Sequence, residues 1–94
     1  MNIKELLSEE TKWTTGAFAR SKDGSLVGPC SPKAVCWCLA GAAKKCYGSE
    51  AHADILQKIY EAAVNRSAGA RSIASWNDTH TYAEVKALVE RLDI

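Results

Sequence analysis

The chain has 94 residues, 47% of them hydrophobic and 24% charged, so it can bury one modest core and is expected to form a single domain over residues 1–94. Twelve basic and eleven acidic residues leave a formal net charge of +1, a balance that offers no basic stripe to a nucleic acid. The longest uncharged apolar run, residues 34–43, is about half of the ~20 residues that a membrane span needs, and no signal peptide is recognisable. We therefore expect a soluble, cytoplasmic protein that binds neither nucleic acid nor a membrane.

The first predicted elements are a short helix and a β-hairpin. Apolar side chains recur at helical spacing over residues 3–11 and predict an amphipathic helix there. The stretch GAFARSKDGSLVG follows, and its Asp23-Gly24 pair is a strong hairpin-turn pattern between two short runs that can pair as strands. We expect a marginal β-hairpin near residues 17–28, which must lie on helices to be stable.

Two longer helices are predicted for the middle of the chain. Ser31 suits an N-cap and Pro32 the first helical position, so the central helix should begin there and run to about Tyr47. Gly48 is expected to end it in a left-handed conformation, and Ser49 to cap the next helix. That helix should run to about residue 65 and bury one apolar face, made of Ile55, Leu56, Ile59, Tyr60 and Ala63.

The last part of the chain predicts one helical turn and one longer helix. The turn falls at SIASWND, and the helix begins with a capping box of Thr81 and Glu84. Its apolar stripe is continuous and consists of Tyr82, Val85, Leu88, Val89 and Leu92. The predicted fold is mainly α, a small single-domain bundle of about four helices with one short β-hairpin.

Three of the four cysteines lie in AVCWCLAGAAKKC, on the predicted central helix. Cys36 and Cys38 would lie about 200° apart around its axis, so they could neither bridge nor share a metal. There is no C-x-x-C pattern, and neither histidine stands at ligand spacing from a cysteine. We therefore predict no metal, no cofactor and free cysteines that fill space in a helix surrounded by protein. Mid-helix Gly41 is explained if another helix packs closely against it.

The polar stretch SWNDTHT is the richest candidate for a ligand site. Trp76 offers an aromatic platform, Asn77 and Asp78 an amide and a carboxylate, and His80 a titratable ring. With Arg71 upstream, these groups could hold a small polar ligand at the mouth of the bundle. The alternative is structural: a turn whose side chains bind their own backbone, a buried tryptophan and a helix cap. Turn and cap chemistry is the commoner use of such residues.

Trp13 and Arg20 mark a second candidate surface, because main-chain groups on the edges of the hairpin could recruit a partner by strand addition. A solvated or covered edge is the alternative at such short strand length.

No catalytic residues are predicted. A Cys–His pair would need Cys30 or Cys46 beside His52 or His80, and no sequence pattern supports any of these pairings. A buried thiol is also inert, because burial disfavours its thiolate.

The order and spacing of WTTGAFAR, the Asp23-Gly24 turn, AVCWCLAGA and SIASWNDTHTYAEV resemble a group of small uncharacterised bacterial and phage proteins, known only as a domain of unknown function. The resemblance covers nearly the whole chain from Trp13 onward. It implies a cytoplasmic bacterial or phage-encoded domain, and it brings no activity and no functional residues with it.

The sequence therefore favours a non-enzymatic module that binds another protein or a second copy of itself. The alternative function is a small polar-ligand binder or minor enzyme that uses Trp76, Asn77, Asp78 and His80.

Overall fold

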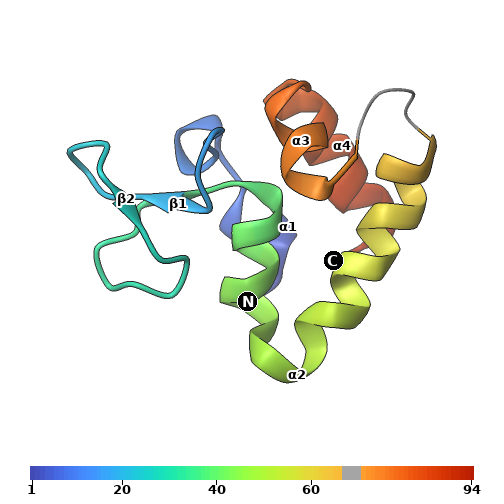
Figure 1. Cartoon of the computed structure of the whole chain (residues 1–94), viewed down its shortest axis with the longest axis horizontal. Helices are drawn as coiled ribbons and strands as arrows, with labels where there is room; N and C mark the ends of the chain where they lie inside the picture. The colour runs from blue at the N-terminus through green and yellow to red at the C-terminus, as the bar shows by residue number, and fades with distance from the viewer. Residues whose placement is uncertain (67–70) are drawn as a thin grey trace.

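The computed structural model describes residues 1–66 and 71–94, without the side chains of residues 49–52 and 66. It confirms a mainly helical fold with a small antiparallel sheet (Figure 1). In chain order the elements are α1 (Ile3–Leu6), the 3-10 helix η1 (Glu10–Lys12), β1 (Ala19–Arg20), β2 (Leu26–Val27), β3 (Cys36–Trp37), α2 (Leu39–Ala62), the 3-10 helix η2 (Val64–Arg66), α3 (Ile73–Asp78) and α4 (Tyr82–Leu92).

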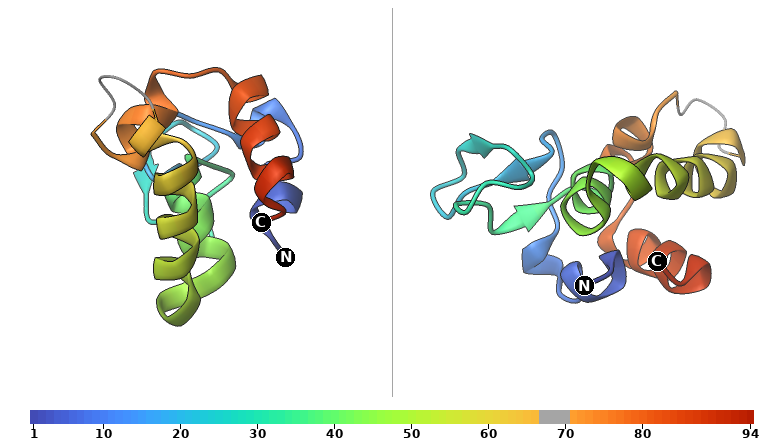
Figure 2. Two further views of the ribbon diagram at one scale, coloured as in Figure 1. Left: turned by 90° about the vertical axis from the view of Figure 1, so that its right-hand side faces the viewer. Right: turned by 90° about the horizontal axis from the view of Figure 1, so that it is seen from below.

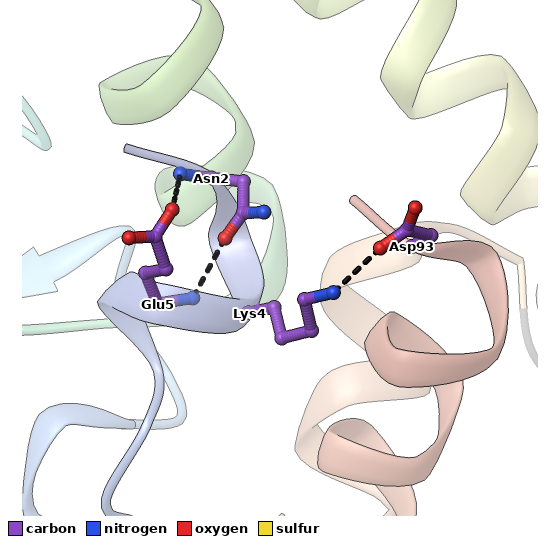
Figure 3. Close-up of polar contacts among 4 residues, drawn as sticks. All are labelled: Asn2, Lys4, Glu5 and Asp93. Atoms are coloured by element: carbon purple, nitrogen blue, oxygen red, sulfur yellow. Dashed lines mark hydrogen bonds and ion pairs between the residues drawn. The ribbon is translucent and has the colours of Figure 1, made fainter.

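The N-terminal helix is shorter than the sequence predicts. Asn2 and Glu5 form a capping box that starts α1, but Leu7 leaves the helical conformation and the helix ends at Leu6. Lys4 pairs with Asp93, beyond the end of α4, so the two ends of the chain are held together (Figure 3). Figure 2 shows α1 and α4 side by side there.

The predicted hairpin is confirmed, with a longer loop than a two-residue turn. Ala19 pairs with Val27 and Arg20 with Leu26, which leaves residues 21–25 between the strands. Gly24 adopts a φ of 87°, a conformation that glycine reaches at no steric cost.

The central helix was predicted to start too early. Residues 36–37 form β3, which pairs antiparallel with β1 and gives the strand order β2-β1-β3. Ser31 accepts from the Lys33 N–H, so the Ser31-Pro32 pair makes a local turn and no helix. Cys38 caps α2 in its place, its sulfur accepting from the Gly41 N–H. Cys36 is therefore on a strand, and its predicted separation from Cys38 around one helix does not apply.

The predicted break at Gly48 is confirmed as a kink inside α2. Gly48 has φ 65° and ψ −164°, so the positive φ is present but the conformation is not the left-handed helical one. The side chain of Ser49, the predicted cap of the second segment, lies outside the described residues, as does most of the loop that follows η2. The second segment runs to Ala62, close to the predicted end.

The core lies mainly between α1, α2, α3 and α4, and Ala19 and Trp37 of the sheet join it at one side. Its largest fully buried apolar side chains are Ile3, Leu7, Leu39, Ile59, Val85 and Val89. Gly41 sits where α2 meets the ribbon: a Cβ there would lie 2.0 Å from the Phe18 carbonyl oxygen. Close packing at Gly41 is thus confirmed, but its neighbour is the backbone of the ribbon, where a helix was expected.

Candidate functional site

The short helix α3 positions the polar cluster that the sequence singles out. Ser72 caps it by accepting from the Ser75 N–H, and α4 begins four residues after it ends, at the predicted capping box of Thr81 and Glu84. Residues four apart share one side of a helix, so Trp76 and His80 lie on one side and Asp78 on another. The cluster is therefore divided between two cavities, with Asn77 buried between them.

Asn77 is fully buried and uses all of its hydrogen-bonding positions inside the protein. Its Oδ1 accepts from Trp13 Nε1 at 2.7 Å and from the Leu39 N–H at 3.0 Å. Its Nδ2 donates to the Thr14 carbonyl and to Asp78 Oδ1, each at 3.1 Å. Asn77 therefore ties α3 to the start of α2 and to the segment before the hairpin, and has no hydrogen bond left for a ligand.

The first cavity, which we call the Trp76–His80 groove, lies between the end of α2, α3 and α4 and has a volume of about 380 Å³. The His80 ring stacks on Trp76 with centroids 4.1 Å apart. His80 Nδ1 lies 2.6 Å from the Trp76 carbonyl oxygen, which can only accept, so Nδ1 carries the hydrogen and Nε2 remains available. Among the described residues the groove is lined by Ala62, Ala63, Trp76, His80, Glu84, Ala87, Leu88 and Arg91.

Two charged side chains border this groove. Glu84 is committed to the capping box, and hydrogen bonds from Thr81, first its N–H, lower the pKa of the Glu84 carboxyl. Arg91 makes no hydrogen bond or ion pair within the described residues. The arrangement can hold a small molecule with an apolar body and an anionic group.

The second cavity, which we call the ribbon pocket, lies where the hairpin meets α2 and α3 and also measures about 380 Å³. Phe18 and Leu26 stand at it with 58% and 67% of their surface exposed. Asp78 is the one charged residue of the lining; its Oδ1 accepts from the Gly16 N–H at 3.0 Å. The lining residues that the structure describes are Gly16, Ala17, Phe18, Leu26, Val27, Cys38, Ala74 and Asp78.

The ribbon pocket was not anticipated from the sequence. The pocket is marked by an unusual order of side-chain sizes. The small Ala19 of β1 is buried, whereas the large Phe18 just before β1 is exposed. Alternating strand residues face opposite sides, so a large apolar residue beside a small inward one indicates an exposed apolar face.

Cys38 forms the inner wall of the ribbon pocket and is only 2% exposed. Burial raises the pKa of its thiol, and the charge of Asp78 raises it further. The thiol is therefore protonated and a weak nucleophile at neutral pH.

The other residues singled out from the sequence are placed apart from both cavities. Arg71 is exposed and lines neither of them. Trp13 donates to Asn77, and the Arg20 guanidinium donates to Thr14 Oγ1 and to the carbonyls of Thr15 and Gly24. Trp13 and Arg20 thus brace the ribbon from within.

The cysteines carry no bridge: Cys30 is exposed, Cys36 and Cys46 are half-buried, and all four are free. Across residues 1–66 and 71–94, leaving out the undescribed side chains, no three His, Cys, Asp or Glu side chains gather as metal ligands would. The side chain of His52 is among those left out. None of the helices in the described part is long and apolar enough to cross a membrane.

These features define a small helical domain with an attached three-stranded ribbon, in which the ribbon pocket and the Trp76–His80 groove hold the polar side chains of α3 and its C-terminal turn. Residues 2–92 match the model of a family described as "Family of unknown function (DUF6197)", and the chain belongs to this family. No curated protein and no solved structure matches it.

Proposed function

We propose that this protein is a non-enzymatic interaction module that docks on a partner protein through the exposed apolar face of its ribbon. The observation that carries the proposal is a concentration of exposed apolar side chains. Of the five large hydrophobic residues exposed in the described part of the chain, Phe18 and Leu26 line the ribbon pocket together, and Val35 lies beside β3, outside that pocket. Apolar surface gathered in one place is typical of interaction sites, whereas single exposed residues are ordinary.

The position of the ribbon supports this role. In Figure 1 the strands lie at one end of the long axis of the molecule, away from α4. β2 is an edge strand, because the strand order is β2-β1-β3. The opposite edge is partly covered, since Trp13 forms a bridge with Trp37 of β3.

The main-chain groups of Leu26 are directed to the open edge. The Ser21 N–H donates to the Ser25 carbonyl, so these residues form a hydrogen-bonded pair. Bonded and non-bonded pairs alternate along an antiparallel ladder, which makes Arg20 and Leu26 a non-bonded pair. Leu26 therefore presents both its side chain and its backbone to an incoming segment, as strand addition requires.

The non-enzymatic part of the proposal rests on the separation of the reactive groups. The protonated Cys38 thiol faces the ribbon pocket, whereas His80 lines the groove on the other side of α3. Four free cysteines suit a reducing compartment and support the proposed cytoplasmic location. A bacterial or phage origin remains part of the proposal.

Paired substitutions test the docking surface. A Phe18→Ser/Leu26→Lys variant removes the apolar face at little expected cost to folding, because both side chains are largely exposed. Tyr60→Ser is the matched control, an exposed large residue on α2. Partners are first identified by quantitative co-purification. Each partner is then purified and titrated against each variant by calorimetry, and light scattering measures self-association.

We expect the double variant to lose binding of the purified partner at least tenfold, with Tyr60→Ser unchanged. The ribbon face is excluded as a docking surface if two results occur together. The wild type, the double variant and Tyr60→Ser bind every partner with equal affinity, and self-association does not depend on Phe18 and Leu26.

A second candidate function is binding of a small anionic ligand in the Trp76–His80 groove, and Arg91, which has no ion pair with any side chain that the structure describes, favours it. Ligand-observed NMR with a library of small carboxylates would detect it, and Arg91→Gln should abolish the binding. Library members that bind the Arg91→Gln variant equally well would exclude the groove as a carboxylate site.

A further inference from the structure

The ribbon pocket combines two kinds of surface that a single side chain can match. Its mouth is apolar, formed by Phe18, Leu26 and Val27, and its wall carries the carboxylate of Asp78. A lysine or arginine side chain that enters head-first matches both surfaces. Its apolar stem lies against the mouth, and its cationic head reaches the carboxylate.

We propose that the ribbon pocket receives the lysine or arginine side chain of an extended partner segment that adds to the open edge of β2. The inference deepens the proposed function and rests on it, because it specifies which segment the ribbon face would bind.

The chemistry of Asp78 supports a cationic occupant. Asp78 Oδ1 is held by the Gly16 N–H and by Asn77 Nδ2, which fixes the carboxylate in place. No hydrogen bond or ion pair of its Oδ2 occurs within the described residues, and no other charged residue lines the pocket. Within the described part of the chain the negative charge is therefore positioned by the fold and forms no ion pair, which is the condition for charge complementarity with a partner.

The electrostatic effect of Asp78 extends to the pocket wall. Burial is the larger cause of the raised pKa of Cys38, and the Asp78 carboxylate adds to it. The Asp78 carboxylate thus disfavours a further negative charge in the pocket, which argues against a carboxylate or phosphate as the occupant.

The extended form of the partner follows from the position of Leu26. A segment hydrogen-bonded to the open edge of β2 places alternate side chains on each side of the sheet. Because the Leu26 side chain lines the pocket, a side chain on the same side of the added strand reaches its mouth.

A displayed library of random nonapeptides, selected on immobilised full-length protein, tests the inference without knowledge of the natural partner. Selections are run on the wild type, on Asp78→Asn and on Asp54→Asn. Asparagine at position 78 keeps an Oδ1 that can accept from Gly16 and Asn77, so the fold should be retained while the charge is lost. Asp54 is an exposed carboxylate of α2, and its substitution is the charge-matched control.

We expect peptides selected on the wild type and on Asp54→Asn to carry lysine or arginine at one position between strand-forming residues, and this preference to disappear on Asp78→Asn. An enriched peptide should then bind the wild type about two- to fivefold more tightly than its norleucine analogue, the range of a partly exposed ion pair, and Asp78→Asn should bind both equally. Chemical shifts of the Gly16, Leu26 and Val27 amides should report the binding.

Two results would overturn the inference but leave the ribbon face as a docking surface. In the first, the enriched peptides shift these amides but carry no basic residue at a fixed position. In the second, peptides selected on Asp78→Asn show the same preference for lysine as peptides selected on the wild type. Peptides whose binding survives Phe18→Ser/Leu26→Lys would contradict the proposed function as well. A selection that enriches no peptide on the wild type would also overturn the inference.

Discussion

At the scale of single residues, Asn77 is the clearest case of a polar side chain whose role is structural. It lies at the meeting point of the segment before the hairpin, the first residue of α2 and α3, and its side-chain carbonyl oxygen accepts from both a buried main-chain N–H and an indole N–H. An unsatisfied buried donor costs far more free energy than a made hydrogen bond returns, so positions of this kind tolerate few substitutions.

We predict that Asn77→Ala lowers the free energy of unfolding by about 2–4 kcal/mol, because it leaves the Leu39 N–H and Trp13 Nε1 without their acceptor. Urea denaturation followed by tryptophan fluorescence measures the change. Asn65→Ala, at an exposed asparagine of η2, is the control and should change stability by less than about 0.5 kcal/mol. A loss at Asn77 no larger than the control would contradict the structural role.

Asp23 gives a pH prediction for the hairpin loop. Hydrogen bonds, first from the Ser21 hydroxyl and then from the Ser25 N–H, lower the pKa of Asp23 from 3.8 to about 2. Because the folded-state pKa lies below the unfolded value, the carboxylate stabilises the loop above pH ~4, and this stabilisation is lost as the pH falls toward 2. NMR titration of the Asp23 side-chain carboxyl should give a pKa well below 3.8; a value near 3.8 would show that the loop does not hold the carboxylate.

At the scale of elements, the parts of the fold with local causes are predictable from the sequence. The capping box of α4 and its apolar stripe lie between Thr81 and Leu92, and the structure has both. Gly48 predicts the kink in α2, because glycine adopts a positive φ at little energetic cost. The Asp23-Gly24 turn likewise locates the hairpin.

Elements with non-local causes are missed. β3 exists because residues 36–37 pair with β1, about seventeen positions earlier in the chain, and nothing in its own two residues requires a strand. The uncharged run of residues 34–43 is compatible with a buried helix or a buried strand, since apolar runs do not distinguish them. The same limit applies to the site: the stretch SWNDTHT is recognisable, but the assignment of Asp78 and His80 to different cavities depends on how α3 packs.

Packing of the ribbon on α2 gives a prediction for Gly41. Gly41→Ala would place a methyl group 2.0 Å from the Phe18 carbonyl oxygen, so the ribbon must move away from the helix. We expect a loss of about 2–4 kcal/mol, the magnitude of severe core strain, although alanine is the better helix former. Gly28→Ala is the control, because a Cβ there meets nothing within 4 Å. Thermal unfolding compares the two, and equal melting temperatures would contradict the contact.

At the scale of the whole molecule, the fold separates its interior chemistry from its surface. The helices and the sheet bury the core and fix Asn77, whereas the ribbon presents apolar side chains and an open edge at one end. The thiols also differ between surface and interior: Cys30 is exposed, whereas Cys38 is buried in the wall of the ribbon pocket.

We predict that alkylation of the native protein is fastest at Cys30, intermediate at Cys36 and Cys46, and slowest at Cys38. Exposure sets the order, and burial also raises the pKa of the Cys38 and Cys46 thiols, which lowers their thiolate fraction. Iodoacetamide labelling followed by peptide mass spectrometry gives the four rates. Cys38 and Cys30 should become equally reactive in denaturant; equal rates in the folded protein would show that the start of α2 is open to solvent.

Photo-crosslinking in the native host cell tests the central claim, docking through the ribbon face, most directly. A benzophenone amino acid at position 26 should give a discrete covalent adduct with a partner chain, because Leu26 lies on the open edge of β2. The same amino acid at position 60, which is also exposed but lies on α2, should give none. Adducts from position 60 but not from position 26, or the same adducts from both, would contradict the claim.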